Sequence, residues 1–139
     1  MKTFSWPVRV YYEDTDSGGV VYYANYLKFM ERARSEWLRS LGFEQDELIA
    51  EDAVLFAVRS VQADYLSPAR FNDLLNVSAR VIKQSKVSLS FEQQITRADD
   101  NKLLCQGEIK IVCLDTDSMS PTRIPEKIMT TIKGMDSEG

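Results

Sequence analysis

The chain has 139 residues, of which 44% are hydrophobic, and it carries a formal net charge of −4. This length and composition predict a single domain with its own core over 1–139. The acidic balance argues against a protein that binds nucleic acid through a basic surface. No apolar run approaches the roughly 20 residues of a membrane-spanning helix, and the N-terminus lacks the apolar core of a signal peptide. We therefore expect no membrane span and a cytoplasmic location.

The first strand is expected at the N-terminus, where apolar and polar side chains alternate. Phe4, Trp6, Val8 and Val10 fall on one face of such a strand. The segment YEDTDSGG follows at positions 12–19. It places three carboxylates and two glycines between this strand and the first helix.

The strongest periodic pattern in the chain runs from Tyr22 to Leu41 and predicts one long helix. Apolar residues recur there at steps of three and four, namely Tyr23, Tyr26, Leu27, Met30, Ala33, Trp37, Leu38 and Leu41. This spacing predicts an apolar stripe that faces a core. Gly42 stands where helices commonly stop, and a short polar helix is expected over 44–51.

Four further strands are expected in the second half of the chain, over 55–65, 75–81, 87–96 and 103–113. Short polar connections between alternating strands imply antiparallel hairpins. A small final helix is expected over 126–133, followed by a loose tail over about 134–139. One amphipathic helix against a strongly twisted antiparallel sheet buries both apolar faces, so the predicted fold class is α+β.

The two cysteines, Cys105 and Cys113, lie eight residues apart in the last predicted strand. At about 3.3 Å per residue they would be about 26 Å apart, whereas a disulfide needs Cα atoms within about 7 Å. We therefore expect two reduced core residues. Two cysteines alone do not make a zinc site, and we expect neither a metal nor a cofactor.

The chain contains no histidine, so an enzyme built from it must use another acid, base or nucleophile. The densest group of candidates is the acidic segment 12–19, with Asp14 and Asp16. Gly18 and Gly19 let the backbone approach a ligand closely, and the helix start downstream offers free N–H groups. Two interpretations stay open on the residues alone: a reaction centre, or a solvated turn whose aspartates cap the helix.

The order of elements is similar to the hot-dog fold, in which a sheet wraps one long central helix. The segment YYEDTDSGGVVYYANY at positions 11–26 resembles the signature of the 4-hydroxybenzoyl-CoA thioesterase family. The likeness is greatest to its YbgC branch, acyl-CoA thioesterases encoded beside the Tol–Pal envelope system. The segments ERAR at 31–34 and YLSPAR at 65–70 also match, and the resemblance covers about 6–132.

This resemblance implies hydrolysis of an acyl-CoA thioester to free acid and coenzyme A. It implies that Asp16, the second aspartate of the motif, is catalytic, and that the backbone N–H of Tyr23 polarises the thioester carbonyl. Many members of the YbgC branch carry histidine at the position of Tyr23, whereas the 4-hydroxybenzoyl-CoA enzyme carries tyrosine. The family also implies a homodimer or homotetramer with the active site at the subunit boundary.

A thioester suits a site without histidine because its leaving group is a thiolate. A model thiol has a pKa of about 8.5, so its expulsion needs little protonation. Asp16 has either to attack the carbonyl, giving a mixed anhydride, or to deprotonate a water molecule. Both routes remain open at this point.

Coenzyme A carries phosphates, so the mouth of the site needs cations. Arg70, Lys83 and Lys86 stand near predicted strand ends and are the candidates. Acyl carrier protein carries the same phosphopantetheine arm and is an alternative acyl donor.

Four other interpretations fit parts of the same segments. The DTD triplet at 14–16 also fits the nucleophile motif of haloacid-dehalogenase-type phosphatases, which need alternating βα units and magnesium. A calcium loop starting at Asp14 would need glutamate where Asn25 stands. Another hot-dog lineage places its catalytic carboxylate on the helix, where Glu31 or Glu36 would serve. The alternative from another class is a non-catalytic protein that binds acyl-CoA or acyl carrier protein.

Overall fold

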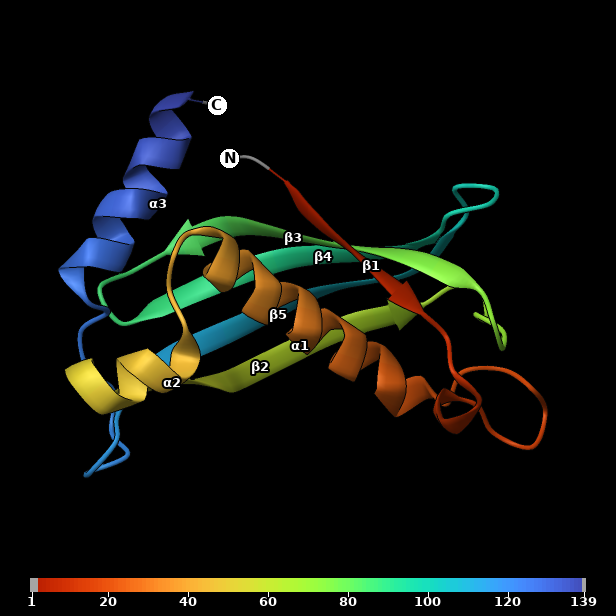
Figure 1. The fold of residues 1–139 in the computed structure, drawn as a ribbon, viewed down its shortest axis with the longest axis horizontal. Coiled ribbons are helices and arrows are strands. Elements are labelled where there is room, and N and C mark those ends of the chain that lie inside the picture. The colour runs from red at the N-terminus through yellow and green to blue at the C-terminus, as the bar shows by residue number, and fades with distance from the viewer. Residues whose placement is uncertain (1–2, 139) are drawn as a thin grey trace.

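Five antiparallel strands form one sheet in the computed structural model, which describes residues 3–138. The strands are β1 (Phe4–Arg9), β2 (Val54–Tyr65), β3 (Leu74–Gln84), β4 (Ser88–Arg97) and β5 (Leu103–Asp115). Their order across the sheet is β1-β3-β4-β5-β2, and every neighbouring pair is antiparallel. The hairpins β3–β4 and β4–β5 join strands that are also consecutive in the sequence, as predicted (Figure 1).

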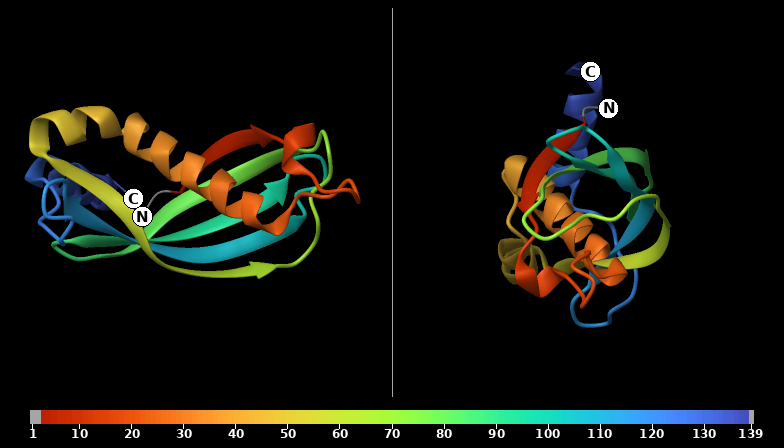
Figure 2. Two further views of the ribbon diagram at one scale, coloured as in Figure 1. Left: turned by 90° about the horizontal axis from the view of Figure 1, so that it is seen from below. Right: turned by 90° about the vertical axis from the view of Figure 1, so that its right-hand side faces the viewer.

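The long helix α1 (Tyr23–Ser40) crosses the sheet, and the strands curl around it (Figure 2). Its core-facing side chains are Tyr26, Phe29, Met30, Ala33, Trp37 and Leu38. The chain leaves the helix through Gly42, whose φ of +96° lies in the left-handed region that favours glycine. The predicted helix and the predicted α+β hot-dog fold are therefore confirmed.

A buried glutamine ties the helix to the sheet. Gln93 of β4 is fully buried, and its Nε2 donates to the carbonyl oxygens of Met30 at 3.0 Å and Ser78 at 3.1 Å. Its Oε1 accepts a hydrogen bond from Arg34 Nη1 at 2.9 Å. Because an unpaired amide would be costly in this core, these three bonds hold α1 in a defined position over β3 and β4.

Cys105 and Cys113 both lie in β5, buried and unpaired, as predicted. Burial raises the pKa of each thiol to about 11. Both side chains therefore stay protonated near neutral pH and serve as small core residues.

The shorter helical elements were predicted only in outline, and the structure gives their bounds. A single turn, α2 (Gln45–Glu47), and a π-helical turn, η2 (Leu48–Asp52), occupy the region expected to be helical over 44–51. The last helix, α3 (Glu126–Glu138), is longer than the predicted 126–133. Among the described residues, no helix has both the length and the apolar character needed to cross a membrane.

The prediction of a loose tail from about 134 is wrong for the part that the structure describes, because α3 continues to Glu138. Ile128 and Ile132 are fully buried one helical turn apart and anchor the helix to the core. No proline follows that would stop the helix. Once a helix is nucleated, each further residue gains a backbone hydrogen bond, so its extension costs little free energy. Gly139 lies outside the described residues.

Candidate active site

The acidic segment forms a tight loop between β1 and α1. The N–H of Asp16 donates to Val20 O at 2.9 Å, and the N–H of Gly19 donates to Asp16 O at 3.0 Å. Thr15 and Val21 pair as an antiparallel bridge. Residues 15–21 therefore make a small hairpin, and Gly19 closes it with a φ of +76° that other residues adopt only with strain. We call residues 14–22 the acidic loop.

Asp16 lies at the tip of the acidic loop with an exposed side chain. Its Oδ1 accepts a hydrogen bond from the N–H of Gly18 at 2.8 Å. Over residues 3–138, no hydrogen bond reaches Oδ2. A Cβ atom at Gly18 would lie 3.3 Å from Asp16 Oδ1, so glycine allows the carboxylate to fold back on its own loop. The Asp16 carboxylate is thus oriented and still accessible.

Asp14 differs from Asp16 in its burial and in its hydrogen bonds. It is only 6% exposed. Its Oδ2 accepts from the N–H of Tyr11 at 2.8 Å, and its Oδ1 accepts from Asn25 Nδ2 at 3.0 Å. Its carbonyl oxygen accepts from the N–H of Tyr22 at 3.0 Å. Asp14 therefore shapes the junction, and the structure separates the two aspartates into a buried and an accessible group.

Tyr23 is the first residue of α1, so its N–H has no acceptor within the helix. The positive end of the helix dipole lies at the same place. The periodic pattern predicts the Tyr23 side chain in the core stripe, and this is wrong, since it is 60% exposed. Its ring contacts those of Tyr22 and Tyr65, with centroids 4.8 Å and 6.1 Å away. These aromatic contacts hold the side chain outside the core and beside the helix start.

Arg70 lies beside the acidic loop. It pairs with Val20 in an antiparallel bridge, and the N–H of Val21 donates to Ala69 O at 2.9 Å. The N–H of Ala69 in turn donates to the buried Tyr26 Oη at 2.9 Å. The structure therefore brings Asp16, Gly18, Gly19, Tyr23 and Arg70 into one region.

Lys83 and Lys86 do not join this group within one chain. β3 starts at Leu74, which pairs with Arg9 near the acidic loop. Lys83 lies nine residues further along, about 30 Å away at 3.3 Å per residue, and Lys86 lies in the turn that follows. The prediction used only the nearness of each lysine to a predicted strand end, which does not tell at which end of the sheet the lysine lies.

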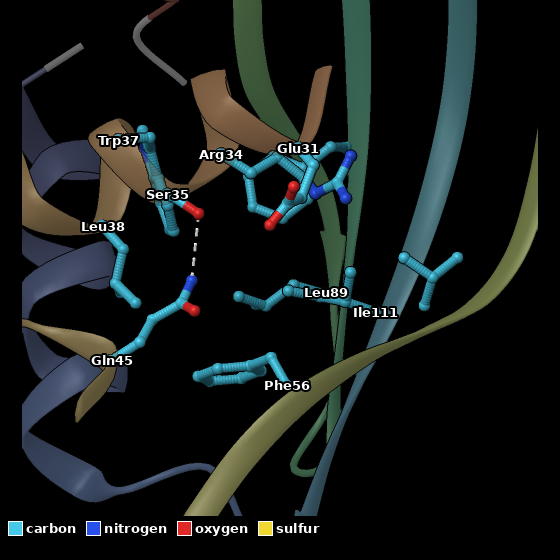
Figure 3. A pocket seen from close by; sticks show the side chains of 11 residues that line it. Glu31, Arg34, Ser35, Trp37, Leu38, Gln45, Phe56, Leu89 and Ile111 are labelled. Carbon is cyan, nitrogen blue, oxygen red and sulfur yellow. Dashed lines mark hydrogen bonds between the residues drawn. The ribbon is translucent and has the colours of Figure 1, made fainter. Parts of the chain in front are cut away.

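A cavity of about 210 Å³ lies between the second half of α1 and the sheet (Figure 3). Its wall is mostly apolar and is made by Trp37, Leu38, Phe56, Val58, Leu89, Phe91 and Ile111, with Glu31, Arg34, Ser35 and Gln45 as polar members. The pKa of the Arg34 guanidinium is lowered by burial, and the nearby Glu31 carboxylate offsets only part of this effect. Gln45 Nε2 donates to Ser35 Oγ at 3.2 Å across one end.

A second hollow, of about 330 Å³, adjoins this cavity. It shares Glu31, Arg34 and Val58 with the first and adds Leu27, Lys28, Val61 and Ile109, so it extends one helical turn closer to Tyr23. On α1, Tyr23, Leu27, Glu31, Arg34 and Leu38 follow one another at steps of three and four, so they share one helix face. We call the space between this helix face and β2 the α1–β2 seam. From Tyr23 to Glu31 it spans about 12 Å at 1.5 Å per residue.

A β-bulge shapes the strand side of the seam. The register of β2 against β5 shifts between Val58 and Ser60. Side chains of a regular strand alternate between faces, so Val58 and Val61 would point to opposite sides. The extra residue of the bulge changes this parity and lets both valines line the same hollow.

The helix carboxylates Glu31 and Glu36 have different surroundings. Glu36 forms an ion pair with Arg39 on the helix surface. Glu31 lines the seam beside Arg34. Within the described part of the chain, no group of three His, Cys, Asp or Glu side chains could hold a metal ion.

The sequence patterns missed three contributors to this region. Asn25 belongs to the recognised segment, but its bond to Asp14 spans eleven positions. Tyr65 and Arg34 carried no signal of their own, because their places depend on how β2 and β4 pack against α1. Only their membership in the segments YLSPAR and ERAR could have indicated them.

Known proteins share both the sequence pattern and the fold of this chain. The family model described as the thioesterase-like superfamily matches residues 10–132. A 1,4-dihydroxy-2-naphthoyl-CoA thioesterase from Synechocystis has the same fold, with a TM-score of 0.89 at 25% identity; the match covers 97% of this chain and 98% of that one. The chain belongs to the thioesterase-like superfamily.

More similar relatives narrow this assignment. The chain is 46% identical over 130 residues to an acyl-CoA thioester hydrolase YbgC from Escherichia coli, covering 94% of this chain and 96% of that protein. It is 43% identical over 125 residues to an acyl-CoA thioesterase YbgC from Haemophilus influenzae, covering 90% of each. The predicted resemblance to the YbgC branch is confirmed, and the chain is a YbgC-like thioesterase.

Proposed function

We propose that this protein hydrolyses acyl-CoA thioesters at the acidic loop. The observation that carries the proposal is the pairing, in a YbgC-like chain, of an accessible oriented carboxylate with a helix start whose first N–H has no acceptor within the helix. Asp16 supplies the carboxylate and Tyr23 the N–H. Relatives named as acyl-CoA thioester hydrolases support the reaction class.

The chemistry divides between the two groups. Asp16 either attacks the thioester carbonyl, giving a mixed anhydride that water then cleaves to free acid, or removes a proton from a water molecule that attacks the carbonyl itself. The N–H of Tyr23, assisted by the helix dipole, stabilises the negative charge that develops on the carbonyl oxygen. The thiolate then leaves with little need for a general acid, because thiols are far more acidic than amines.

The acyl group is proposed to lie in the α1–β2 seam. The seam begins at the contact between Tyr23 and Tyr65 and leads to the apolar cavity around Phe56. Apolar walls favour an aliphatic or aromatic acyl group over a charged one. The thioester carbon would then rest near the helix start while its chain follows the helix.

Arg70 is the proposed cation for the coenzyme A phosphates, since its backbone pairs with the acidic loop and its side chain is exposed. Lys83, near the far end of β3, and Lys86, in the turn after it, lie too far away to reach the same loop in one chain. A second chain would have to supply them, and we propose a homodimer or homotetramer. Acyl carrier protein remains an alternative donor of the same arm.

The decisive experiment compares the wild type with Asp16→Asn across acyl-CoA chain lengths, with release of free thiol as the readout. We expect kcat to fall by at least about 100-fold, because a positioned base or nucleophile contributes at least that much. Asp99→Asn, an exposed aspartate in the turn after β4, is the matched control. Near-normal hydrolysis by Asp16→Asn would remove Asp16 from the mechanism.

The same assay separates an enzyme from an acyl-binding scaffold. A scaffold would bind acyl-CoA, detectable by calorimetry, and release no thiol at any chain length. Running acyl carrier protein thioesters beside the coenzyme A thioesters identifies the preferred donor. Turnover of either class excludes the scaffold function.

A further inference from the structure

The two reacting groups are flanked in the sequence by the partners of a partly buried side-chain hydrogen bond. Asp16 lies two residues after Asp14, and Tyr23 lies two residues before Asn25. Asp14 Oδ1 accepts from Asn25 Nδ2 at 3.0 Å. This bond joins the two ends of the acidic loop, and the backbone bond from Tyr22 N–H to Asp14 O runs beside it at 3.0 Å.

Asp14 also fixes the loop to the strand that precedes it. Its Oδ2 accepts from the N–H of Tyr11 at 2.8 Å, just beyond the end of β1. One carboxylate therefore connects the exit of β1, the start of the acidic loop and the first turn of α1. Because it is 6% exposed, water competes little for these bonds.

The rest of the loop is a small hairpin held by backbone bonds, from Asp16 N–H to Val20 O at 2.9 Å and from Gly19 N–H to Asp16 O at 3.0 Å. Its tip carries Gly18 and Gly19, and the side chains of Ser17 and Asp16 are exposed. The hairpin holds Asp16 within the loop, and the Asp14–Asn25 bond holds the two ends of the loop together, so both contribute to the distance between the Asp16 carboxylate and the Tyr23 N–H. A catalytic pair misplaced by about 1 Å loses about 100-fold in rate.

We infer that Asp14 and Asn25 are positioning residues for the hydrolysis, setting the placement of the Asp16 carboxylate against the Tyr23 N–H without touching the substrate. The inference rests on the proposed function. It assigns the first aspartate of the acidic segment a role distinct from that of the second. It also gives Asn25 a role through its amide donor, which aspartate at the same place lacks.

The bond can be broken and rebuilt by exchanging its partners. In Asn25→Asp two carboxylates face each other at about 3 Å and repel, since neither has a proton to donate. In the double variant Asp14→Asn with Asn25→Asp, the amide introduced at position 14 donates to the carboxylate introduced at position 25. The oxygen of that amide still accepts from Tyr11 N–H. The exchange therefore restores both hydrogen bonds with the direction of one reversed.

The experiment measures kcat and KM for the wild type, Asn25→Asp, Asn25→Ala and the double exchange, at a temperature where melting curves show all of them folded. We expect kcat to fall about 10- to 100-fold in Asn25→Asp with KM within about threefold of wild type, the loss expected for a small misplacement of the reacting groups. The double exchange should recover most of that loss. Asn25→Ala, which deletes one bond without repulsion, keeps the test open if Asn25→Asp does not fold.

Wild-type kcat in a folded Asn25→Asp or Asn25→Ala overturns the inference. A loss of kcat that the double exchange does not recover also overturns it, because the bond itself would then not be the cause. If Asp16→Asn is inactive while the Asn25 variants are normal, only the positioning role fails; if Asp16→Asn is active, the proposed function fails first.

Discussion

At the scale of single residues, we expect the backbone of Tyr23 to matter more for catalysis than its side chain. The ring lies on Tyr22 and Tyr65 outside the core, whereas the N–H opens the helix without an intrahelical acceptor. If the N–H polarises the carbonyl, the side chain is free to vary.

Two substitutions at this position separate the N–H from the ring. Tyr23→Pro removes the N–H at the first helical position, where proline is well tolerated. Tyr22 already has the extended conformation that a residue before proline needs, with φ −62° and ψ 131°. We expect Tyr23→Pro to lose about 100- to 1,000-fold in kcat, as for other lost oxyanion donors, and Tyr23→Ala less than about tenfold.

Steady-state kinetics of the two variants, with melting temperatures as the folding control, check this prediction. A Tyr23→Ala enzyme as inactive as Asp16→Asn would show that the ring, and not the N–H, supports the reaction. Equal activity of Tyr23→Pro and the wild type would remove the N–H from the mechanism.

At the scale of elements, α1 and β2 together form the α1–β2 seam. The helix supplies one face of the seam, and the bulged strand supplies Val58 and Val61 on the other. Gln93 holds the helix at a fixed height over the sheet and orients Arg34 at the middle of the seam. The depth of the proposed acyl site therefore depends on the packing between these elements.

Filling the seam should change chain-length preference. Val58 lines both hollows, so Val58→Trp is expected to obstruct the path from the acidic loop to the cavity. We expect kcat/KM for long acyl chains to fall at least about tenfold relative to the shortest substrates, measured over a chain-length series, because each methylene excluded from an apolar pocket costs about 1 kcal/mol or more. Ile82→Trp, at an exposed apolar position of β3, is the control. A uniform change across the series would place the acyl group elsewhere.

At the scale of the whole molecule, the two edges of the sheet are unequal. β1 is six residues long and contains Pro7, features that protect an edge from further pairing. β2 forms the opposite edge with twelve residues, and Val58, Val61 and Tyr65 are exposed along it. Such an edge favours association with a second chain.

We therefore expect light scattering to give a mass of about twice the 15.9 kDa of one chain, or a multiple of that dimer mass. Val61→Lys, which places a charge on this edge, should shift the population toward the monomer; the measured mass is the readout, because Val61 also lines the α1–β2 seam. The exposed Ile82→Lys on β3 is its control. A fully active monomer at all concentrations would contradict the proposed assembly.

Periodicity predicted α1 within one residue at each end, because a long amphipathic pattern has few competing interpretations. The four later strands were equally well marked by alternation and short polar turns. The prediction of a tail from Gly134 failed, since local composition does not report the anchoring of Ile128 and Ile132 in the core. The pattern also placed Tyr23 in the core, because periodicity cannot tell where a helix leaves the cover of its sheet.

The sequence by itself determined the α+β class, the family and the segment that carries Asp16, since these follow from local patterns and a contiguous motif. Only the tertiary structure decided which aspartate is buried, which cation lies beside the loop and where an acyl group would fit. Those properties depend on pairs such as Asp14–Asn25, Val20–Arg70 and Arg34–Gln93, which lie 11, 50 and 59 positions apart. Contacts over such separations arise from the packing of α1 into the curled sheet, which no local pattern encodes.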